Sequence, residues 1–222
     1  MAARASTRND IATLLRPAPD PDFRQERSRR SYQALIEAAE AMFAAHGYDA
    51  VGTPEIAQKA GVSVGTFYRY FDDKHEVYLE ISRRMMAEAY SSTIEGLTPA
   101  RFIGLERHET IAETIALLFD HVLSRPELSR TFMEMSLRDP EVGEIRRAFE
   151  QVSCQKLTAL ISAICPRDIV PDPEATAYVV YGSALQTAYG LAGYLGAPPV
   201  AADRAKKALT SFIERALFPS PE

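Results

Sequence analysis

The sequence has few residues of the kinds that bind metals or form cross-links. Its 222 residues include two cysteines, Cys154 and Cys165, too few for a secreted-type disulfide framework and outside any zinc-binding pattern. The four histidines stand singly, and no Gly-rich phosphate loop is present. We therefore expect a cytoplasmic protein with reduced cysteines, no metal and no cofactor.

Long apolar runs are also scarce. One charge-free stretch, 175–202, is long enough to cross a bilayer. It contains Thr, Ser, Gln and several Gly residues as well as Pro198-Pro199, and its flanks show no Lys/Arg bias. The N-terminal arginines are not followed by the apolar run of about 7–15 residues that a signal peptide requires. We expect neither a membrane helix nor a signal peptide.

The alternation typical of β-strands is almost absent, whereas helical patterns recur along the chain. Apolar residues in 35–43 fall at helical spacing on one face. Two nearly identical helix starts occur, Asp139-Pro140-Glu141 and Asp172-Pro173-Glu174, and we expect the second helix to end at about Leu195. We predict an all-α protein of about nine helices. Its expected parts are a disordered tail (1–22), an N-terminal domain (23–89) and a larger C-terminal domain (90–222).

Residues 52–71 predict two short helices joined by a tight turn. Thr53-Pro54-Glu55 combines a hydroxyl cap, a proline at the first helical position and an acid in the first turn. Gly61-Val62 separates this helix from a second one, which Ser63 can cap. This is the helix–turn–helix arrangement, whose second member enters the DNA major groove.

The residues on the exposed side of this motif suit a DNA groove. Hydroxyls and helix N-terminal amides hold phosphates, whereas arginine, threonine or apolar side chains can touch base edges. The candidate DNA contacts are Thr53, Ser63, Val64, Gly65, Thr66, Tyr68, Arg69, Tyr70 and Lys74. For each of them a plain structural role is the alternative, such as a cap for Ser63 or a half-buried aromatic for Tyr68.

Taken together, these residues resemble a known family. The stretch "TPEIAQKAGVSVGTFYRYFDDKHEVYLEI" from Thr53 to Ile81, with "ALIEAAEAMFAAHGYDA" from Ala34 to Ala50, is similar to the N-terminal domain of TetR-family transcriptional regulators. The resemblance implies a dimeric, ligand-responsive regulator of operator DNA, most often a repressor. It also implies phosphate contacts by Thr53, Thr66, Tyr68, Tyr70 and Lys74. Two positions depart from the family pattern: Val64 is often polar there, and Asp72-Asp73 replaces the common Pro-Ser.

Positive charge is in short supply for a DNA-binding protein, since the chain carries a net charge of −5. The shortage is uneven: residues 1–30 have a net charge of +3 and residues 31–222 one of −8. The arginines before the first expected helix could follow the DNA backbone or enter the minor groove. The charge therefore leaves DNA binding open but predicts weak non-specific affinity.

The C-terminal domain contains no recognisable motif, and the resemblance implies that it binds a small molecule and pairs with a second copy. Ligand sites between helices are mostly apolar with a few polar groups. Candidate pocket residues are Phe119, His121, Phe132, Met133, Met135, Phe149, Tyr178, Tyr181 and Gln186. Candidate dimer-interface residues are Gly182, Gly190, Gly193, Leu209 and Phe212. The alternative for both sets is the ordinary core of a single chain.

Two other function classes compete. Gly61-Val62-Ser63-Val64-Gly65 matches the G-x-S-x-G pattern of serine hydrolases, but that nucleophile elbow requires a preceding β-strand, and a capped helix is expected there. A helical module that binds protein rather than DNA is consistent only with the C-terminal part. We predict a protein that is not an enzyme and has no catalytic residues, a transcriptional repressor released from its operator by a small, largely apolar ligand.

Overall fold

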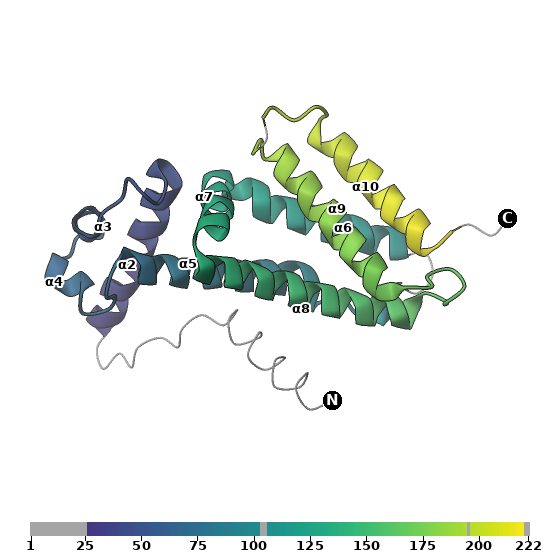
Figure 1. The fold of residues 1–222 in the computed structure, drawn as a ribbon, viewed down its shortest axis with the longest axis horizontal. Helices are drawn as coiled ribbons and strands as arrows, with labels where there is room; N and C mark the ends of the chain where they lie inside the picture. Colours follow the sequence, from purple (N-terminus) through teal and green to yellow (C-terminus); the bar gives the residue numbers. More distant parts are fainter. Residues whose placement is uncertain (1–25, 103–105, 195, 220–222) are drawn as a thin grey trace. The chain divides into compact units, whose positions relative to one another are not determined.

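The computed structural model describes residues 26–102, 106–194 and 196–219 (Figure 1). The expected tail, 1–22, lies outside this part. The described residues form nine α-helices and no strand, so the predicted all-α class is confirmed. The helices are α2 (Glu26–His46), α3 (Thr53–Lys59), α4 (Val64–Phe67), α5 (Lys74–Tyr90), α6 (Glu106–Ser124), α7 (Pro126–Arg138), α8 (Pro140–Ile164), α9 (Pro173–Leu191) and α10 (Ala202–Leu217). A π-helical turn (Ser91–Glu95) and a 3-10 turn (Pro99–Phe102) follow α5.

Aspartate caps fix several helix starts as the sequence predicts. Asp139 accepts hydrogen bonds from the backbone amides of Glu141 and Val142, each at 3.0 Å, at the start of α8. Asp172 accepts one from the amide of Ala175, also at 3.0 Å, at the start of α9. The prediction for the end of α9 was wrong by about one turn.

Two helix boundaries, the end of α9 and the start of α2, differ from the sequence expectation. The helix α9 ends at Leu191, because Gly193 adopts a left-handed φ of +79° shortly after it. The first helix, α2, begins at Glu26, so Arg27, Arg29 and Arg30 belong to the helix itself and not to an arm before it. The other four arginines of residues 1–30 lie outside the described residues.

The chain divides into two compact units. Unit 1 holds the described residues up to Ala87 together with Glu127–Ala148, and unit 2 holds Glu88–Pro126 and the chain from Phe149 onward. The first boundary falls close to the predicted one at residue 89. The return of residues 127–148 to unit 1 was not predicted, and it brings α7 and the first two turns of α8 into that unit.

The core of unit 1 is aromatic. Phe43 and Phe67 are completely buried, and the ring of Phe43 meets that of Tyr78 edge-on, with 5.1 Å between centroids. Phe71 stacks on Tyr32 at 5.3 Å and so joins the end of the helix–turn–helix segment to α2. These contacts fix α2, α4 and α5 against one another.

Unit 2 is built around α6, α9 and α10. Its buried centre includes Ile115 and Phe119 of α6, Ala188 of α9, and Leu209 and Ile213 of α10. No described helix, α9 included, is both long enough and apolar enough to cross a membrane.

Candidate functional site

The turn between α3 and α4 has the geometry of a helix–turn–helix. Gly61 has a φ of +69°, which a glycine adopts without strain. The amide of Val62 donates to the carbonyl of Ala57 at 3.0 Å, and that of Gly61 donates to the carbonyl of Gln58 at 3.1 Å. This pair of bonds is the Schellman motif, which ends α3 and turns the chain directly into α4.

Ser63 is the cap of α4. Its hydroxyl accepts a hydrogen bond from the amide of Thr66 at 3.1 Å and lies 2.9 Å from the Thr66 hydroxyl. Helix α3 precedes Ser63, as the sequence predicts, in place of the strand that a nucleophile elbow requires. Burial also raises the pKa of the Cys154 thiol to about 11, the opposite of an activated cysteine.

The outer face of α4 presents exposed side chains. Val64 is 39% exposed and Tyr68 is 55% exposed, whereas Phe67 between them is fully buried. Gly65 is exposed, and a Cβ at this position would lie 3.8 Å from its nearest neighbour, Ser63 Oγ. The fold of unit 1 therefore does not require a glycine at position 65.

The partly buried Thr53 and the exposed Arg69 complete the group. Thr53 is the first residue of α3 and not its cap as predicted, because Gly52 takes the cap position without a side-chain bond. Arg69 is exposed, and its guanidinium lies 5.8 Å from the centre of the Tyr70 ring. Seven of the nine predicted residues thus lie at or near one surface: Thr53, Ser63, Val64, Gly65, Thr66, Tyr68 and Arg69.

The other two predicted residues have partners inside unit 1. The hydroxyl of Tyr70 donates to the carbonyl of Ser28 in α2 at 3.1 Å. The ammonium of Lys74 donates to the carbonyls of Tyr48 at 3.0 Å, Asp49 at 3.4 Å and Val51 at 2.9 Å. It also lies 4.5 Å from the centre of the Tyr48 ring. An ammonium has three N–H donors, and the three carbonyls are enough to accept all of them.

The same turn, 47–51, is held from a second side by the corner between α7 and α8. Arg138 donates two hydrogen bonds to the Asp49 carboxylate, at 2.8 and 3.2 Å, and these bonds lower the pKa of Asp49. Next to it, Asp139 lies 2.9 Å from the ring Nε2 of His75 in the first turn of α5. Burial opposes the ionisation of Asp139, but the amide of Val142, His75 and the amide of Glu141 together lower its pKa. Residues 138–139 therefore fasten both the α2–α3 turn and α5, which sequence reasoning missed.

The acidic pair Asp72-Asp73 serves the fold. Asp73 accepts a hydrogen bond from the amide of Glu76 at 2.9 Å, and Glu76 accepts one from the amide of Asp72 at 2.6 Å. The reciprocal pair closely resembles a capping box at the start of α5, as the sequence predicts.

Comparison with known proteins agrees with this geometry. The family described as "Bacterial regulatory proteins, tetR family" matches residues 35–81, which include the whole helix–turn–helix. Residues 35–81 are a TetR-type DNA-binding domain. The chain is a DNA-binding transcriptional regulator.

Similar proteins extend the match beyond the DNA-binding domain. The chain is 27% identical to the transposon Tn10 TetC protein of Escherichia coli over 159 residues, 71% of this chain and 74% of that protein. It is 31% identical to the transcriptional activator FasR of Mycolicibacterium smegmatis over 146 residues, 65% and 63% of the two chains. The fold matches that of a TetR-family regulator from Syntrophomonas wolfei with a TM-score of 0.64 and 16% identity, over 85% of this chain and 95% of that one. FasR and the Syntrophomonas wolfei protein are regulators of transcription.

Unit 2 contains an apolar cavity. About 810 Å³ of empty space, part of it open to solvent, lies among side chains of α6, α8, α9 and α10. Among the residues that the structure describes, the hydroxyls in its wall belong to Thr93, Thr114 and Tyr181, and no charged side chain lines it. Thr93 and Thr114 already donate to carbonyls of their own helical turns, at 2.6 and 2.8 Å. The wall therefore suits a hydrocarbon surface.

The structure brings together few of the predicted pocket residues. Phe149 and Tyr181 line the cavity, with ring centroids 6.3 Å apart. Phe119 is buried in the core of unit 2 but does not line the cavity, and burial lowers the pKa of the neighbouring His121. Seven of the nine candidates do not line this cavity: Phe119, His121, Phe132, Met133, Met135, Tyr178 and Gln186. Phe132, Met133 and Met135 belong to α7 in unit 1.

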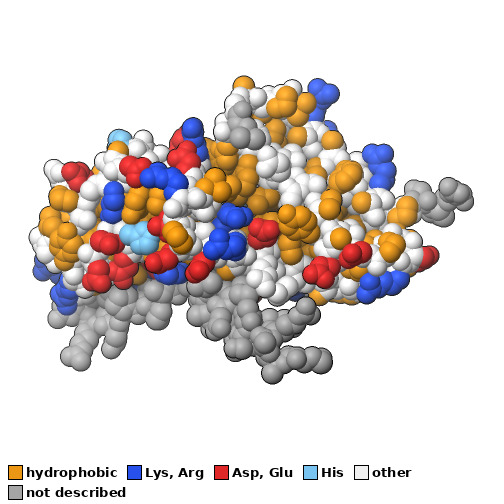
Figure 2. Space-filling model, viewed as in Figure 1, with side chains coloured by type: hydrophobic (Ala, Val, Ile, Leu, Met, Phe, Trp, Pro, Cys, Tyr) orange, Lys and Arg blue, Asp and Glu red, His pale blue; other side chains and the backbone are white. Residues whose placement is uncertain are grey.

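One face of α9 is exposed and uncharged after its first turn. Tyr178 is 61% and Val179 is 55% exposed, and Gly182 and Gln186 continue the same face at helical spacing. The helix α10 packs beside α9 and exposes Phe212 by 52%. We call these five residues the α9–α10 stripe. On the face shown in Figure 2, white and orange atoms predominate where α9 and α10 lie, and charged side chains lie at the margins.

The predicted dimer residues divide between this stripe and the interior. Gly182 and Phe212 are exposed, and nothing lies within 4 Å of a Cβ built at Gly182 or at Gly190. Leu209 is 7% exposed and packs in the unit 2 core, so its assignment to a surface was wrong. Gly193 has the left-handed φ described above, which explains the glycine without an interface.

Proposed function

We propose that this TetR-family regulator acts in the cytoplasm as a homodimeric repressor, released from its operator by a small apolar effector. The observation that supports the DNA-binding part is the outer face of α4. There Val64, Gly65 and Tyr68 are exposed on a helix–turn–helix, and the space around Gly65 does not require a glycine. Val64 and Arg69 would touch base edges in the major groove, and the hydroxyls of Thr53, Thr66 and Tyr68 would hold phosphates on either side.

The phosphate role of Tyr68 gives a first prediction. Replacing Tyr68 by phenylalanine removes only the exposed hydroxyl, so we expect DNA binding to weaken by about 5- to 10-fold, the loss of one hydrogen bond of about 1–1.5 kcal/mol. A phosphate contact has no sequence preference, so the loss should be equal for all DNA sequences. Fluorescence anisotropy with a selected operator and a scrambled duplex measures both values. A change in the ratio of the two affinities would show that Tyr68 reads bases instead.

The effector is proposed to bind in the unit 2 cavity. A wall without charges cannot stabilise a buried carboxylate or phosphate, so the enclosed part of the ligand must be neutral and largely hydrocarbon. Ser153 does not line the cavity, but its fully buried hydroxyl has no hydrogen-bond partner among the described residues and lies one turn from two lining residues, Phe149 and Leu157.

Filling the cavity tests this assignment. Ala184 of α9 lines the cavity, and Ala184→Phe would place a ring in the empty space. We expect this variant to bind an uncharged naphthylamine dye at least 10-fold more weakly than the wild type, while still binding DNA. Ala163→Phe, the same change at an exposed position of α8, is the matched control and should leave dye binding unchanged. Equal dye affinity in both variants would place the effector elsewhere.

The α9–α10 stripe is proposed to pair with the same stripe of a second copy. Exposed aromatic and β-branched side chains around a glycine are typical of a homodimer interface, and Gly182 would allow close helix approach. A dimer presents two helix–turn–helix segments to successive major grooves, about 34–36 Å apart.

Release from the operator follows as a population shift. The helix α8 contributes Phe149 and Leu157 to the cavity wall in unit 2 and Val142 and Ile145 to the core of unit 1. An effector that binds one arrangement of α8 more tightly favours dimers whose two α4 helices no longer match the groove spacing. In vitro transcription with and without effector tests the sign of the regulation. If the protein lowers transcription and the effector restores it to the level without protein, the proposal is supported. If the protein with effector raises transcription above that level, the proposal is contradicted.

A further inference from the structure

Three arginines stand at the start of α2, at the end where the helix dipole is positive. Arg27, Arg29 and Arg30 follow Glu26, and all four residues are exposed. A cation near a helix N-terminus typically costs about 0.3–1 kcal/mol, so the stability of α2 does not explain their presence. We call these three residues the arginine turn; with Glu26 its net charge is +2.

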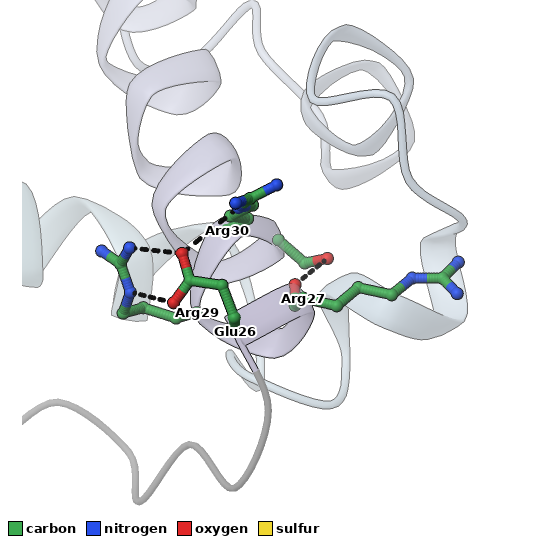
Figure 3. Close-up of polar contacts among 5 residues, drawn as sticks. Glu26, Arg27, Arg29 and Arg30 are labelled. Atoms are coloured by element: carbon green, nitrogen blue, oxygen red, sulfur yellow. Dashed lines mark hydrogen bonds and ion pairs between the residues drawn. The ribbon is translucent and has the colours of Figure 1, made fainter.

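Glu26 pairs with two of the three arginines (Figure 3). Arg29 donates to both carboxylate oxygens of Glu26, at 2.6 and 3.0 Å, and Arg30 donates through Nε at 3.2 Å. These hydrogen bonds lower the pKa of Glu26 to about 2, so the carboxylate stays charged at any pH at which the protein works. Arg27 points away from the Glu26 carboxylate in Figure 3 and pairs with no carboxylate among the described residues.

The arginine turn lies beside the end of the helix–turn–helix segment. The hydroxyl of Tyr70 donates to the carbonyl of Ser28, inside the arginine turn, at 3.1 Å. The ring of Tyr70 meets that of Tyr32 edge-on at 5.6 Å, one turn further along α2. Arg69, on the candidate DNA surface, lies over the same Tyr70 ring. Tyr70 therefore links Arg69 to the first two turns of α2, where the three arginines lie.

We infer that the arginine turn is a second site for DNA backbone phosphates, and that Glu26 competes with the phosphate for Arg29 and Arg30. The inference rests on the DNA-binding function of the helix–turn–helix. It adds contacts outside α3 and α4, and it assigns Glu26 the role of limiting DNA affinity.

The chemistry of the guanidinium group allows both partners in turn. Arginine has five N–H donors, and Arg30 gives Glu26 only its Nε–H, so its terminal nitrogens remain able to bind a phosphate. Like a phosphate, the Glu26 carboxylate is negatively charged and has acceptor oxygens. It occupies donors of Arg29 and Arg30 and repels a DNA phosphate that approaches them. Exposed ion pairs of this kind contribute about 0–1 kcal/mol, so DNA can displace Glu26 at little cost.

The test compares DNA binding by the full chain and by Glu26→Gln over a range of salt concentrations. Each additional phosphate neutralised steepens the slope of log K against log salt by about 0.9 and tightens binding roughly 5-fold at 0.15 M salt. We expect Glu26→Gln to show this gain for each head, with random-sequence DNA as well as with an operator. We expect Arg27→Gln and Arg30→Gln each to make the slope shallower by about the same amount.

Glu37→Gln is the matched control. It removes the same charge from an exposed position of α2 that lies 11 residues, about 16 Å, further along the helix. This distance exceeds the Debye length of about 8 Å at 0.15 M salt, so neither affinity nor slope should change. Equal effects of Glu26→Gln and Glu37→Gln, or no gain with Glu26→Gln, would overturn the inference while leaving DNA binding itself intact. Absence of binding by the wild type would contradict the DNA-binding function as well.

Discussion

Replacing Phe212 by glutamate is expected to convert the dimer into monomers and to weaken binding to a two-half-site operator by at least 100-fold. Phe212 is a large side chain of α10 that is half exposed, and α10 packs beside α9 with its uncharged exposed face. If a second copy covers this face, the variant buries an unpaired carboxylate, which costs several kcal/mol. The loss in DNA binding follows because two linked heads gain about 10²- to 10⁴-fold over one head alone.

Sedimentation velocity and operator binding measure the two effects on the same sample. Leu117→Glu is the control, since Leu117 is 46% exposed on α6, outside the α9–α10 stripe. Gly182→Leu provides a second variant: nothing lies within 4 Å of a Cβ at this position, so the single chain should tolerate leucine while the dimer does not. A Phe212→Glu protein that remains dimeric would contradict the interface assignment.

Lys74→Met is expected to lower the free energy of unfolding of unit 1 by about 2–3 kcal/mol and to leave the salt dependence of DNA binding unchanged. The ammonium of Lys74 holds the carbonyls of Tyr48, Asp49 and Val51, so its loss leaves the α2–α3 turn without these donors. A phosphate contact would have the reverse signature, a slope shallower by about 0.9 with little change in stability.

Urea unfolding and anisotropy titrations at several salt concentrations distinguish the two roles of Lys74. Lys59→Met is the matched control, because Lys59 is an exposed lysine in the last turn of α3. If Lys74→Met changes the slope and Lys59→Met does not, Lys74 contacts the DNA backbone and its position in the fold is secondary.

The sequence predicts the parts of this molecule that depend on local chemistry. The caps at Asp139, Asp172 and Ser63 form because their partners are two or three residues away, and residues at that distance are visible in the sequence. The Schellman turn at Gly61 is local for the same reason. The all-α class and the position of the helix–turn–helix follow from these signals.

Contacts between distant segments could not be predicted from the sequence. The partners of Lys74 lie 23–26 residues away, in a turn whose carbonyls carry no sequence signal. Arg138 and Asp49 are 89 residues apart. An apolar stripe such as Phe132 and Met135 predicts burial but not the unit in which it occurs. The helix α9 is apolar on all sides, so its sequence pattern does not indicate that Tyr178 faces solvent.

The central claim is that residues of α3 and α4 bind operator DNA from two linked heads. The most direct test is selection of duplexes from a random pool by the wild-type protein, followed by footprinting and anisotropy at about 50 and 200 mM salt. The account predicts a sequence with two similar half-sites about 34–36 Å apart, bound at least 100-fold more tightly than either half-site alone. Failure to enrich any sequence, with no binding at the lower salt concentration, would contradict it.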